Sequence, residues 1–140
     1  MSSRLKRVLL VDDNPADVFL HTRVLRKAGC VEQIDSCDSA ESALEYLRGG
    51  AGGPPPRPDL IFLDINMPGM GGWGFLDAYR ALPSELRGGV VIAMLTVSPS
   101  RTDSSRAEGF PELAAYLNKP LTRTTLAALL AHHFPDVVVQ

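Results

Sequence analysis

The stretch DLIFLD at residues 59–64 decides the fold, because four large apolar side chains stand in a row between two carboxylates. Pro58 precedes the stretch and Pro68-Gly69 follows it, so we expect a strand that is buried on both faces. Such strands belong to parallel sheets that helices cover on both sides. Ligands of these sheets bind at the carboxyl ends of the strands, and Asp64 occupies such an end.

Three other apolar runs also end in residues with chemically active side chains. If the strands are parallel, their carboxyl ends meet at one rim of the sheet. The sequence therefore predicts three carboxylates, one hydroxyl and one ammonium at this rim. The runs are 8–11, followed by Asp12 and Asp13; 90–95, followed by Thr96; and 113–117, followed by Asn118 and Lys119.

Helical patterns separate the strands, and a short alternating segment at residues 31–37 indicates an edge strand. Strand and helix alternate five times, which predicts an α/β fold with right-handed crossovers. We expect a flavodoxin-like, doubly wound, five-stranded parallel sheet of order 2-1-3-4-5, with helices on both faces. The helices are expected at residues 15–28, 40–48, 73–82, 99–108 and 122–133. In the first of them the spacing of the apolar residues places Leu20 on the buried face and His21 away from it.

The length of 140 residues fits one domain, residues 1–140, with a core at about 6–133 and short tails. The Gly/Pro-rich segment 49–58 is expected to be a surface connector. A net charge of −2 gives no general attraction to nucleic acid or anionic membranes. No apolar run is long enough to span a bilayer, and we expect a cytoplasmic protein with reduced Cys30 and Cys37.

The predicted carboxylate cluster suits a metal ion. Three carboxylates in one crevice repel one another, and hard oxygen ligands without His or Cys favour Mg²⁺ or Mn²⁺. Alternatively, Asp12 and Asp13 cap the first helix, which explains one of them better than both. Lys119 and Thr96 add an ammonium and a hydroxyl that bind anions. Together these groups favour phosphoryl transfer, with an Asp as the covalent acceptor.

These motifs resemble the receiver domain of two-component response regulators, over residues 6–133. The resemblance rests on Asp12-Asp13, on Asp64 with Met67-Pro68-Gly69, on Thr96, and on Lys119-Pro120. The opening VDDNPADV at residues 11–18 is further similar to stand-alone receivers that partner phytochrome-type histidine kinases.

The resemblance implies a mechanism and a metal set. Asp64 would attack the phosphohistidine of a sensor histidine kinase and become the phosphoacceptor. Mg²⁺ would be bound by Asp13, Asp64 and the backbone carbonyl of Asn66, with Asp12 acting partly through water. Thr96 and Lys119 would each bind a phosphoryl oxygen.

The resemblance also implies a switch, in which Thr96 moves toward the phosphate and Tyr116 swings inward behind it. For Tyr116 the alternative is an aromatic side chain half-buried on the last strand. Val97 departs from the small residue usual in receivers, and its bulk could narrow access to Asp64. Ser98 and Asn66 stand at positions that tune the lifetime of the phosphoryl group.

The resulting expectation is a single-domain receiver that binds no nucleic acid and signals through contact with a downstream protein or through a phosphorelay. Concentration-dependent association into a homodimer is a further expectation. It would be no enzyme beyond its own phosphorylation and dephosphorylation. One alternative is a degenerate receiver that acts as an unphosphorylated scaffold. The other is a phosphatase of the haloacid dehalogenase type, although those enzymes carry a second acid where this chain has Asn66.

Overall fold

The computed structural model describes residues 4–49, 57–97 and 101–140. Five strands alternate with five helices, and a 3₁₀ turn at Ser84–Leu86 precedes the fourth strand. The strands are β1 (Leu5–Val11), β2 (Val31–Cys37), β3 (Leu60–Asp64), β4 (Val91–Thr96) and β5 (Leu113–Asn118). The helices are α1 (Pro15–Ala28), α2 (Ala40–Arg48), α3 (Gly71–Arg80), α4 (Arg101–Ala107) and α5 (Arg123–His133).

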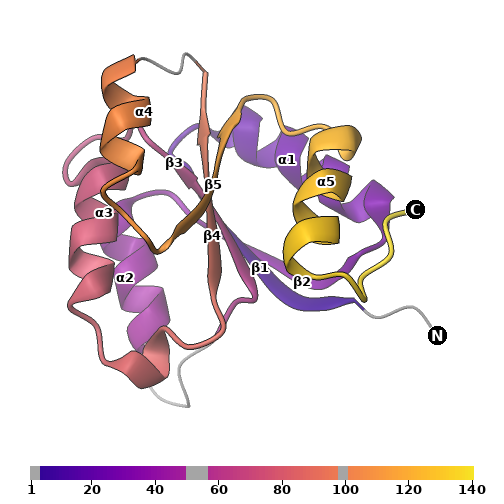
Figure 1. Ribbon diagram of the computed structural model, residues 1–140, viewed down its shortest axis with the longest axis horizontal. Coiled ribbons are helices and arrows are strands. Elements are labelled where there is room, and N and C mark those ends of the chain that lie inside the picture. The colour runs from indigo at the N-terminus through magenta and orange to yellow at the C-terminus, as the bar shows by residue number, and fades with distance from the viewer. Residues whose placement is uncertain (1–3, 50–56, 98–100) are drawn as a thin grey trace.

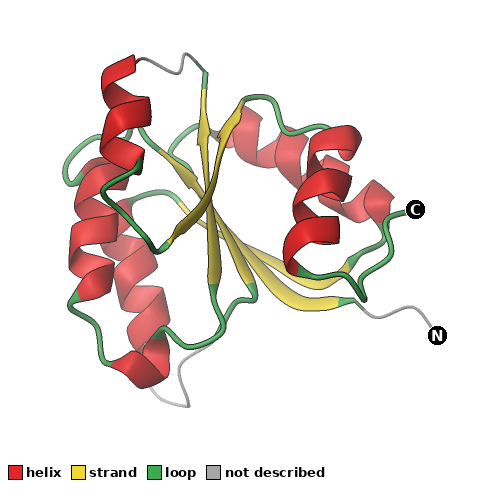
Figure 2. Ribbon diagram, in the orientation of Figure 1, coloured by secondary structure: helices red, strands yellow, loops and turns green. Residues whose placement is uncertain are grey.

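The strands form one parallel sheet of order β2-β1-β3-β4-β5, which confirms the predicted flavodoxin-like α/β topology. Helices cover both faces of the sheet (Figure 1). Helices α1 and α5 lie on one side, and α2, α3 and α4 lie on the other, so the three layers are helix, sheet and helix (Figure 2). All parallel strands thus deliver their carboxyl ends to one rim.

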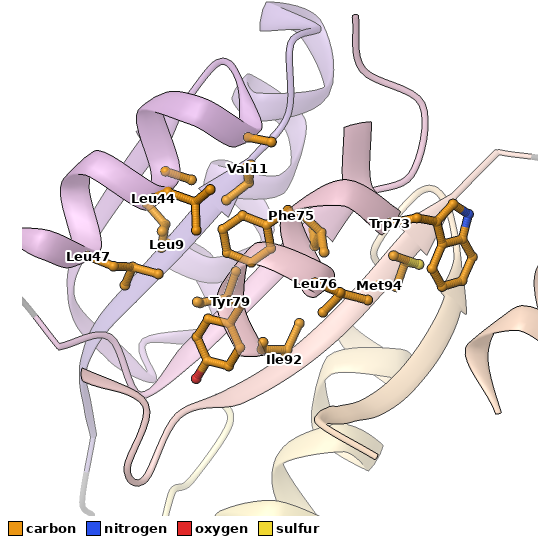
Figure 3. Close-up of a cluster of buried hydrophobic side chains, with 14 of the residues drawn as sticks. Leu9, Val11, Leu44, Leu47, Trp73, Phe75, Leu76, Tyr79, Ile92 and Met94 are labelled. Carbon is orange, nitrogen blue, oxygen red and sulfur yellow. The ribbon is translucent and has the colours of Figure 1, made fainter. Parts of the chain in front are cut away.

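The central strands are buried on both faces, as the run at residues 59–64 predicts. In β1, Leu9 and Val11 belong to the apolar cluster beneath α2 and α3 (Figure 3). Val8 and Leu10 point the other way, into the cluster beneath α1 and α5. Every residue of β3 is buried. This double burial fixes the position of Asp64, because its strand cannot shift without exposing one of the two clusters.

The helix ends follow the capping chemistry that the sequence suggests. The Asn14 side chain accepts hydrogen bonds from the backbone N–H groups of Ala16 and Asp17 at the start of α1. Gly29 ends this helix in the left-handed conformation, with φ of 60°. At α2, Ser39 and Ser42 form a reciprocal capping box. Helix α1, which connects β1 to β2, is thus capped by Asn14 directly after Asp12 and Asp13.

Helix α3 begins two residues before the predicted start and ends two residues before the predicted end. The Gly-rich sequence around Gly71 and Gly72 suggested a loop, but the Gly72 N–H donates to the Ile65 carbonyl at 3.0 Å. A Cβ at Gly72 would lie 2.5 Å from the Asp64 carbonyl oxygen. Glycine is required here because the helix packs directly on the backbone that carries Asp64.

Two side chains of α1 lie opposite to their expected environments. The sequence pattern placed His21 away from the apolar face, yet only 2% of this residue is exposed. Leu20 was expected on the apolar face and is 48% exposed. The helix is rotated so that Leu25 and Ala28 pack on the sheet together with His21.

Helix α4 ends at Ala107, one residue before the end of the segment 99–108 predicted for it, and the predicted start at residues 99–100 lies outside the described residues. Its last turn carries Arg106, whose guanidinium lies 5.1 Å from the centre of the Trp73 ring. The expectations for Ser98 and for most of the connector, residues 50–56, fall outside the described residues. Among the helices of the described ranges, none combines the length and apolarity needed to cross a membrane.

Candidate functional site at the carboxyl rim of the sheet

The rim collects the polar residues that the sequence places after the strands. Asp12 and Asp13 directly follow β1, Asp64 ends β3, and Thr96 ends β4. The Lys119 backbone N–H donates to the Thr96 carbonyl at 2.7 Å, which joins the ends of β4 and β5. Residues that lie far apart in the sequence therefore share one site.

Three carboxylates form a group that can hold a metal ion. One oxygen each from Asp12, Asp13 and Asp64 lies within 4.8 Å of the others. Asp12 and Asp64 are both 6% exposed, whereas Asp13 is exposed to solvent. Carboxylates are the donors that Mg²⁺ prefers, and an open side leaves room for its waters. The donor set thus fits the Mg²⁺ that the sequence suggested.

Capping of α1 does not explain why Asp12 and Asp13 stand together at the end of β1. Asn14 is the N-cap of α1, and Asp12 accepts the Asn14 backbone N–H through Oδ1 at 2.9 Å. Asp12 therefore stabilises the turn before the helix, while its Oδ2 faces Lys119 at 2.8 Å. The alternative in which both acids serve only as caps does not describe this geometry.

The Lys119 ammonium lies among three carboxylates. Its Nζ is 2.8 Å from Asp12 Oδ2, 2.8 Å from Asp17 Oδ2 and 3.3 Å from Asp64 Oδ1. The Lys119 side chain is only 7% exposed. A buried ammonium is stable only when it is paired, and these carboxylates supply the pairing.

Burial and charge perturb both members of the central pair. Burial and the Asp12 charge together raise the pKa of Asp64 to about 6, although Lys119 opposes them. Burial alone would lower the pKa of Lys119. The hydrogen bonds to Asp12 and Asp17 and the nearby charges outweigh that effect, so the pKa of Lys119 is raised overall. At neutral pH Lys119 is a cation and Asp64 is mostly a carboxylate.

Thr96 brings a buried hydroxyl to the rim. The residue is 1% exposed, and its Oγ1 lacks a hydrogen-bond partner within the described ranges. A buried hydroxyl without a partner costs free energy, so its presence at the end of β4 favours a role in binding a ligand. A phosphoryl oxygen is an acceptor that would satisfy it.

The remaining predicted residues surround this centre. Asn66 is exposed after β3, and a hydrogen bond from its backbone to the Asp64 carboxylate lowers the pKa of that group against the larger effect of burial. Tyr116 on β5 pairs with Met94 and packs, half-buried, against the cluster beneath α2 and α3. Val97 is 69% exposed next to Thr96.

Two residues of α1 belong to the site although the sequence did not single them out. Asp17 contacts Lys119, and His21 follows it by one helical turn. Burial, followed by the Lys119 charge, lowers the pKa of His21. The available signal was the spacing of four residues, which places Asp17 and His21 on one helix face.

Aromatic contacts join helix α3 to the segment between α4 and β5. Trp73 follows Gly72 and stacks on Phe110, with ring centres 5.6 Å apart. The Arg80 guanidinium lies over the Phe110 ring, 4.5 Å from the ring centre. Because Trp73 adjoins the glycine that touches Asp64, its environment is expected to report changes at the rim.

A cleft of about 280 Å³ opens beside the acidic group, between the ends of β1 and β2. Asp12, Asp13, Cys37 and Asp38 are among its lining residues. A larger cleft, about 430 Å³, lies at the opposite end of the strands near Leu5. Of these two clefts the smaller one borders the carboxylate group, so we assign the chemistry to that end of the sheet.

The chain belongs to the response regulator receiver domain family, whose model matches residues 8–131. The fold and the acidic group at the rim agree with this assignment. The family assignment confirms the resemblance found in the sequence and favours a receiver over a phosphatase of the haloacid dehalogenase type.

Two curated relatives illustrate how the domain is used. The probable methanogenesis regulatory protein FilR2 of Methanothrix harundinacea is 32% identical over 115 residues, which cover 82% of this chain and 72% of the relative. The sensor histidine kinase GacS of Pseudomonas protegens is 30% identical over 131 residues, which cover 93% of this chain. The matched part is only 13% of GacS, so the chain corresponds to one portion of that protein.

Solved structures agree with the fold. A two-component response regulator from Cytophaga hutchinsonii is 30% identical, with a TM-score of 0.83 over 95% of this chain and 99% of that one. The bacteriophytochrome response regulator RtBRR is 26% identical, with a TM-score of 0.78 over 93% of this chain and 78% of that one. The chain is thus similar to receivers that include a phytochrome response regulator.

Proposed function

We propose that this protein is a response regulator that accepts a phosphoryl group on Asp64 from a sensor histidine kinase, in a Mg²⁺-dependent reaction. The observation that carries the proposal is the position of the Lys119 ammonium, 3.3 Å from Asp64 and within a group of carboxylates that fits a divalent cation. A single carboxylate at the end of a strand would need neither a nearby ammonium nor a group of further carboxylates.

Asp64 supplies the nucleophile. Its carboxylate oxygen would bond to phosphorus while the bond from phosphorus to the kinase imidazole breaks, and the electron pair of that bond stays on the imidazole nitrogen. Ionisation is required, and a pKa of about 6 leaves Asp64 ionised at neutral pH. Mg²⁺ held by Asp12, Asp13, Asp64 and the Asn66 carbonyl would neutralise charge on the phosphoryl oxygens.

Lys119 and Thr96 would bind the transferred group. Lys119 already donates toward Asp64, so a phosphoryl oxygen attached to Asp64 would lie within reach of the ammonium. The Thr96 hydroxyl would gain the acceptor that the described structure does not give it. Both interactions strengthen as charge develops on the phosphoryl oxygens.

Thr96 and Tyr116 are proposed as the switch. Thr96 ends β4, and Tyr116 lies on the neighbouring strand β5, half-buried against the cluster beneath α2 and α3. A new charge on Asp64 that draws Thr96 toward it would change the packing next to Tyr116. The surface of α4, β5 and α5 would then carry the signal to a partner protein.

The proposal includes a stand-alone receiver, residues 1–140, that acts in the cytoplasm through a downstream protein or a phosphorelay and associates into a homodimer. The similarity to RtBRR supports a phytochrome-type kinase as the donor. The solved chain of the regulator from Cytophaga hutchinsonii is matched over 99% of its length, which supports a receiver of this size. Free Cys30 and Cys37 are consistent with a reducing compartment.

The test is binding of beryllofluoride, a phosphoryl mimic, in the presence of Mg²⁺. Trp73 fluorescence and calorimetry would follow the titration on the wild type, on Asp64→Asn, and on Asp77→Asn as a matched control. Asp77 is an exposed acid on α3. We expect saturable binding by the wild type and the control, and no binding by Asp64→Asn.

A folded wild type that binds no beryllofluoride would support the scaffold alternative. Turnover of a small phosphate ester would instead support a phosphatase. Oligomeric state is measured in the same samples by light scattering, and a monomer with and without beryllofluoride would exclude the proposed homodimer.

A further inference from the structure

Asp17 is the partner of Lys119 that the metal-binding group does not include. In the described ranges, the Lys119 ammonium contacts Asp12, Asp17 and Asp64. Asp12 and Asp64 belong to the carboxylate group that can hold a cation, and Asp17 does not. The three contacts therefore respond differently when a divalent cation enters.

The ammonium has three N–H donors, and three carboxylates are arranged around it. A cation bound by Asp12 and Asp64 would weaken their attraction for Lys119, because their charge would be shared with the metal ion. The charge of Asp17 is not shared in this way. Asp17 would thus keep Lys119 at the rim when its two other partners turn to the metal.

The position of Asp17 is well defined. Its backbone N–H donates to the Asn14 cap at 3.3 Å, which fixes the first turn of α1. Its Oδ2 lies 2.8 Å from Lys119 Nζ, the same distance as the Asp12 contact. The Asp17 side chain is 26% exposed and the Lys119 side chain is 7% exposed, so the contact is shielded on the lysine side.

His21 lies on the same face of α1 as Asp17, but it is not among the residues whose contacts with the Lys119 ammonium are found in the described ranges. His21, one turn further along α1, is buried, and its Nε2 has no hydrogen-bond partner in the part of the chain that the structure describes. Asp17 is therefore the group of α1 that binds the ammonium.

We propose that Asp17 is a positioning residue for phosphoryl transfer, which holds the Lys119 ammonium beside Asp64 while Asp12 and Asp64 bind the metal ion. Lys119 can then keep one N–H directed at Asp64 and at a phosphoryl oxygen attached to it. This inference rests on the proposed function and adds a specific contact from α1 to it.

Beryllofluoride binding at saturating Mg²⁺ tests the inference by calorimetry. Asp17→Ala removes the acceptor and should weaken binding at least about tenfold, as expected for the loss of a hydrogen bond to a charged group. Asp17→Asn keeps an acceptor oxygen without the charge. Its affinity for beryllofluoride should therefore lie between that of Asp17→Ala and that of the wild type.

Asp77→Asn is the control for the loss of one negative charge. Asp77 is an exposed acid on α3, and it belongs neither to the lining of the cleft beside Asp12 and Asp13 nor to the carboxylates that contact Lys119. Its effect on beryllofluoride binding should stay within about twofold. A titration with Mg²⁺ alone should give similar affinities for Asp17→Ala and this control.

A double-mutant cycle separates positioning from general structural damage. If Asp17 acts through Lys119, then Asp17→Ala should cause no further loss of beryllofluoride affinity in a Lys119→Gln background. A structural role would weaken binding in both backgrounds. Thermal unfolding of each variant establishes that the compared proteins are folded.

Three results would overturn the inference: equal binding by Asp17→Ala and Asp77→Asn, tighter binding by Asp17→Ala, or the same loss in the Lys119→Gln background. Each requires a wild type that binds beryllofluoride. A folded wild type that does not bind would overturn the proposed function, and the inference about Asp17 with it.

Discussion

Asp64→Asn should stabilise the metal-free protein at neutral pH. The carboxyl group of Asp64 is buried beside Asp12, and its pKa rises from 3.8 to about 6. One pKa unit corresponds to about 1.36 kcal/mol, so keeping Asp64 ionised costs the fold about 3 kcal/mol. This cost already includes the attraction of Lys119. Asparagine removes the cost, but it places a buried amide N–H₂ group at the same position, which offsets part of the gain. We therefore expect a net gain of about 2 kcal/mol.

The gain should depend on pH in a defined direction. At pH 3 the carboxyl group is protonated in the folded and the unfolded chain, so Asp64→Asn should gain nothing from this source. As pH rises from about 4 to about 7, the unfolded chain ionises first and the wild type loses stability relative to the variant. The full difference should be present at pH 7.5.

Urea unfolding in the presence of a chelator measures the difference across this range. A gain of about 2 kcal/mol corresponds to a rise of roughly 4–8 °C in Tm for a domain of this size. The free energy of unfolding of Asp77→Asn should stay within about 0.5 kcal/mol of the wild-type value across this pH range, because the substitution changes an exposed acid. Added Mg²⁺ should stabilise the wild type more than Asp64→Asn, since ligand binding stabilises the folded state.

A stabilisation of Asp64→Asn that does not change between pH 3 and pH 7.5 would refute this reasoning, since the cost would then not come from ionisation. A variant less stable than the wild type at pH 7.5 would show that the contact between Asp64 and Lys119 outweighs the cost of burying the charge.

Three further substitutions test other parts of the site. Thr96→Val removes a buried hydroxyl that has no partner in the described structure, so stability should stay equal or rise by about 1 kcal/mol while beryllofluoride binding weakens. Gly72→Ala places a Cβ 2.5 Å from the Asp64 carbonyl and should cost about 1–3 kcal/mol in urea unfolding, whereas Gly88→Ala, whose nearest contact is 3.7 Å, should be tolerated far better. Val97→Ala changes a side chain that is 69% exposed and should leave stability within about 0.5 kcal/mol. If the valine narrows access to Asp64, this variant should be phosphorylated faster by phosphoramidate, and an unchanged rate would contradict that expectation.

The sequence was sufficient for the sheet because its strands are buried on both faces. The uninterrupted apolar runs at β1, β3 and β4 predict central parallel strands, and the polar residues after them predict the chemical rim. The order of the strands and the grouping of Asp12, Asp13 and Asp64 then follow from the topology, and the structure confirms both.

The start of α3 was not predictable from local preference. Gly71 and Gly72 have low helix propensity and were assigned to a loop. The helix begins there because it packs against the backbone of Asp64 and Ile65, where a side chain would collide. Tertiary packing decides this boundary.

The contribution of α1 was missed for a related reason. Its apolar residues do not fix the rotation of the helix to within one residue, so Leu20 was expected inside and His21 outside. The structure shows the reverse, and the same rotation brings Asp17 to Lys119. A contact between residues that are 102 positions apart depends on how two elements pack, which no local pattern reports.

Chemical identification of the phosphorylated residue tests the central claim most directly. The protein would be incubated with phosphoramidate and Mg²⁺, reduced with borohydride, which converts an aspartyl phosphate to homoserine, and analysed by peptide mass spectrometry. The expected result is homoserine at position 64 in the wild type, with none in Asp64→Asn or without Mg²⁺. Modification at another residue, or a folded wild type that shows no modification, would contradict the assignment of Asp64 as the phosphoacceptor.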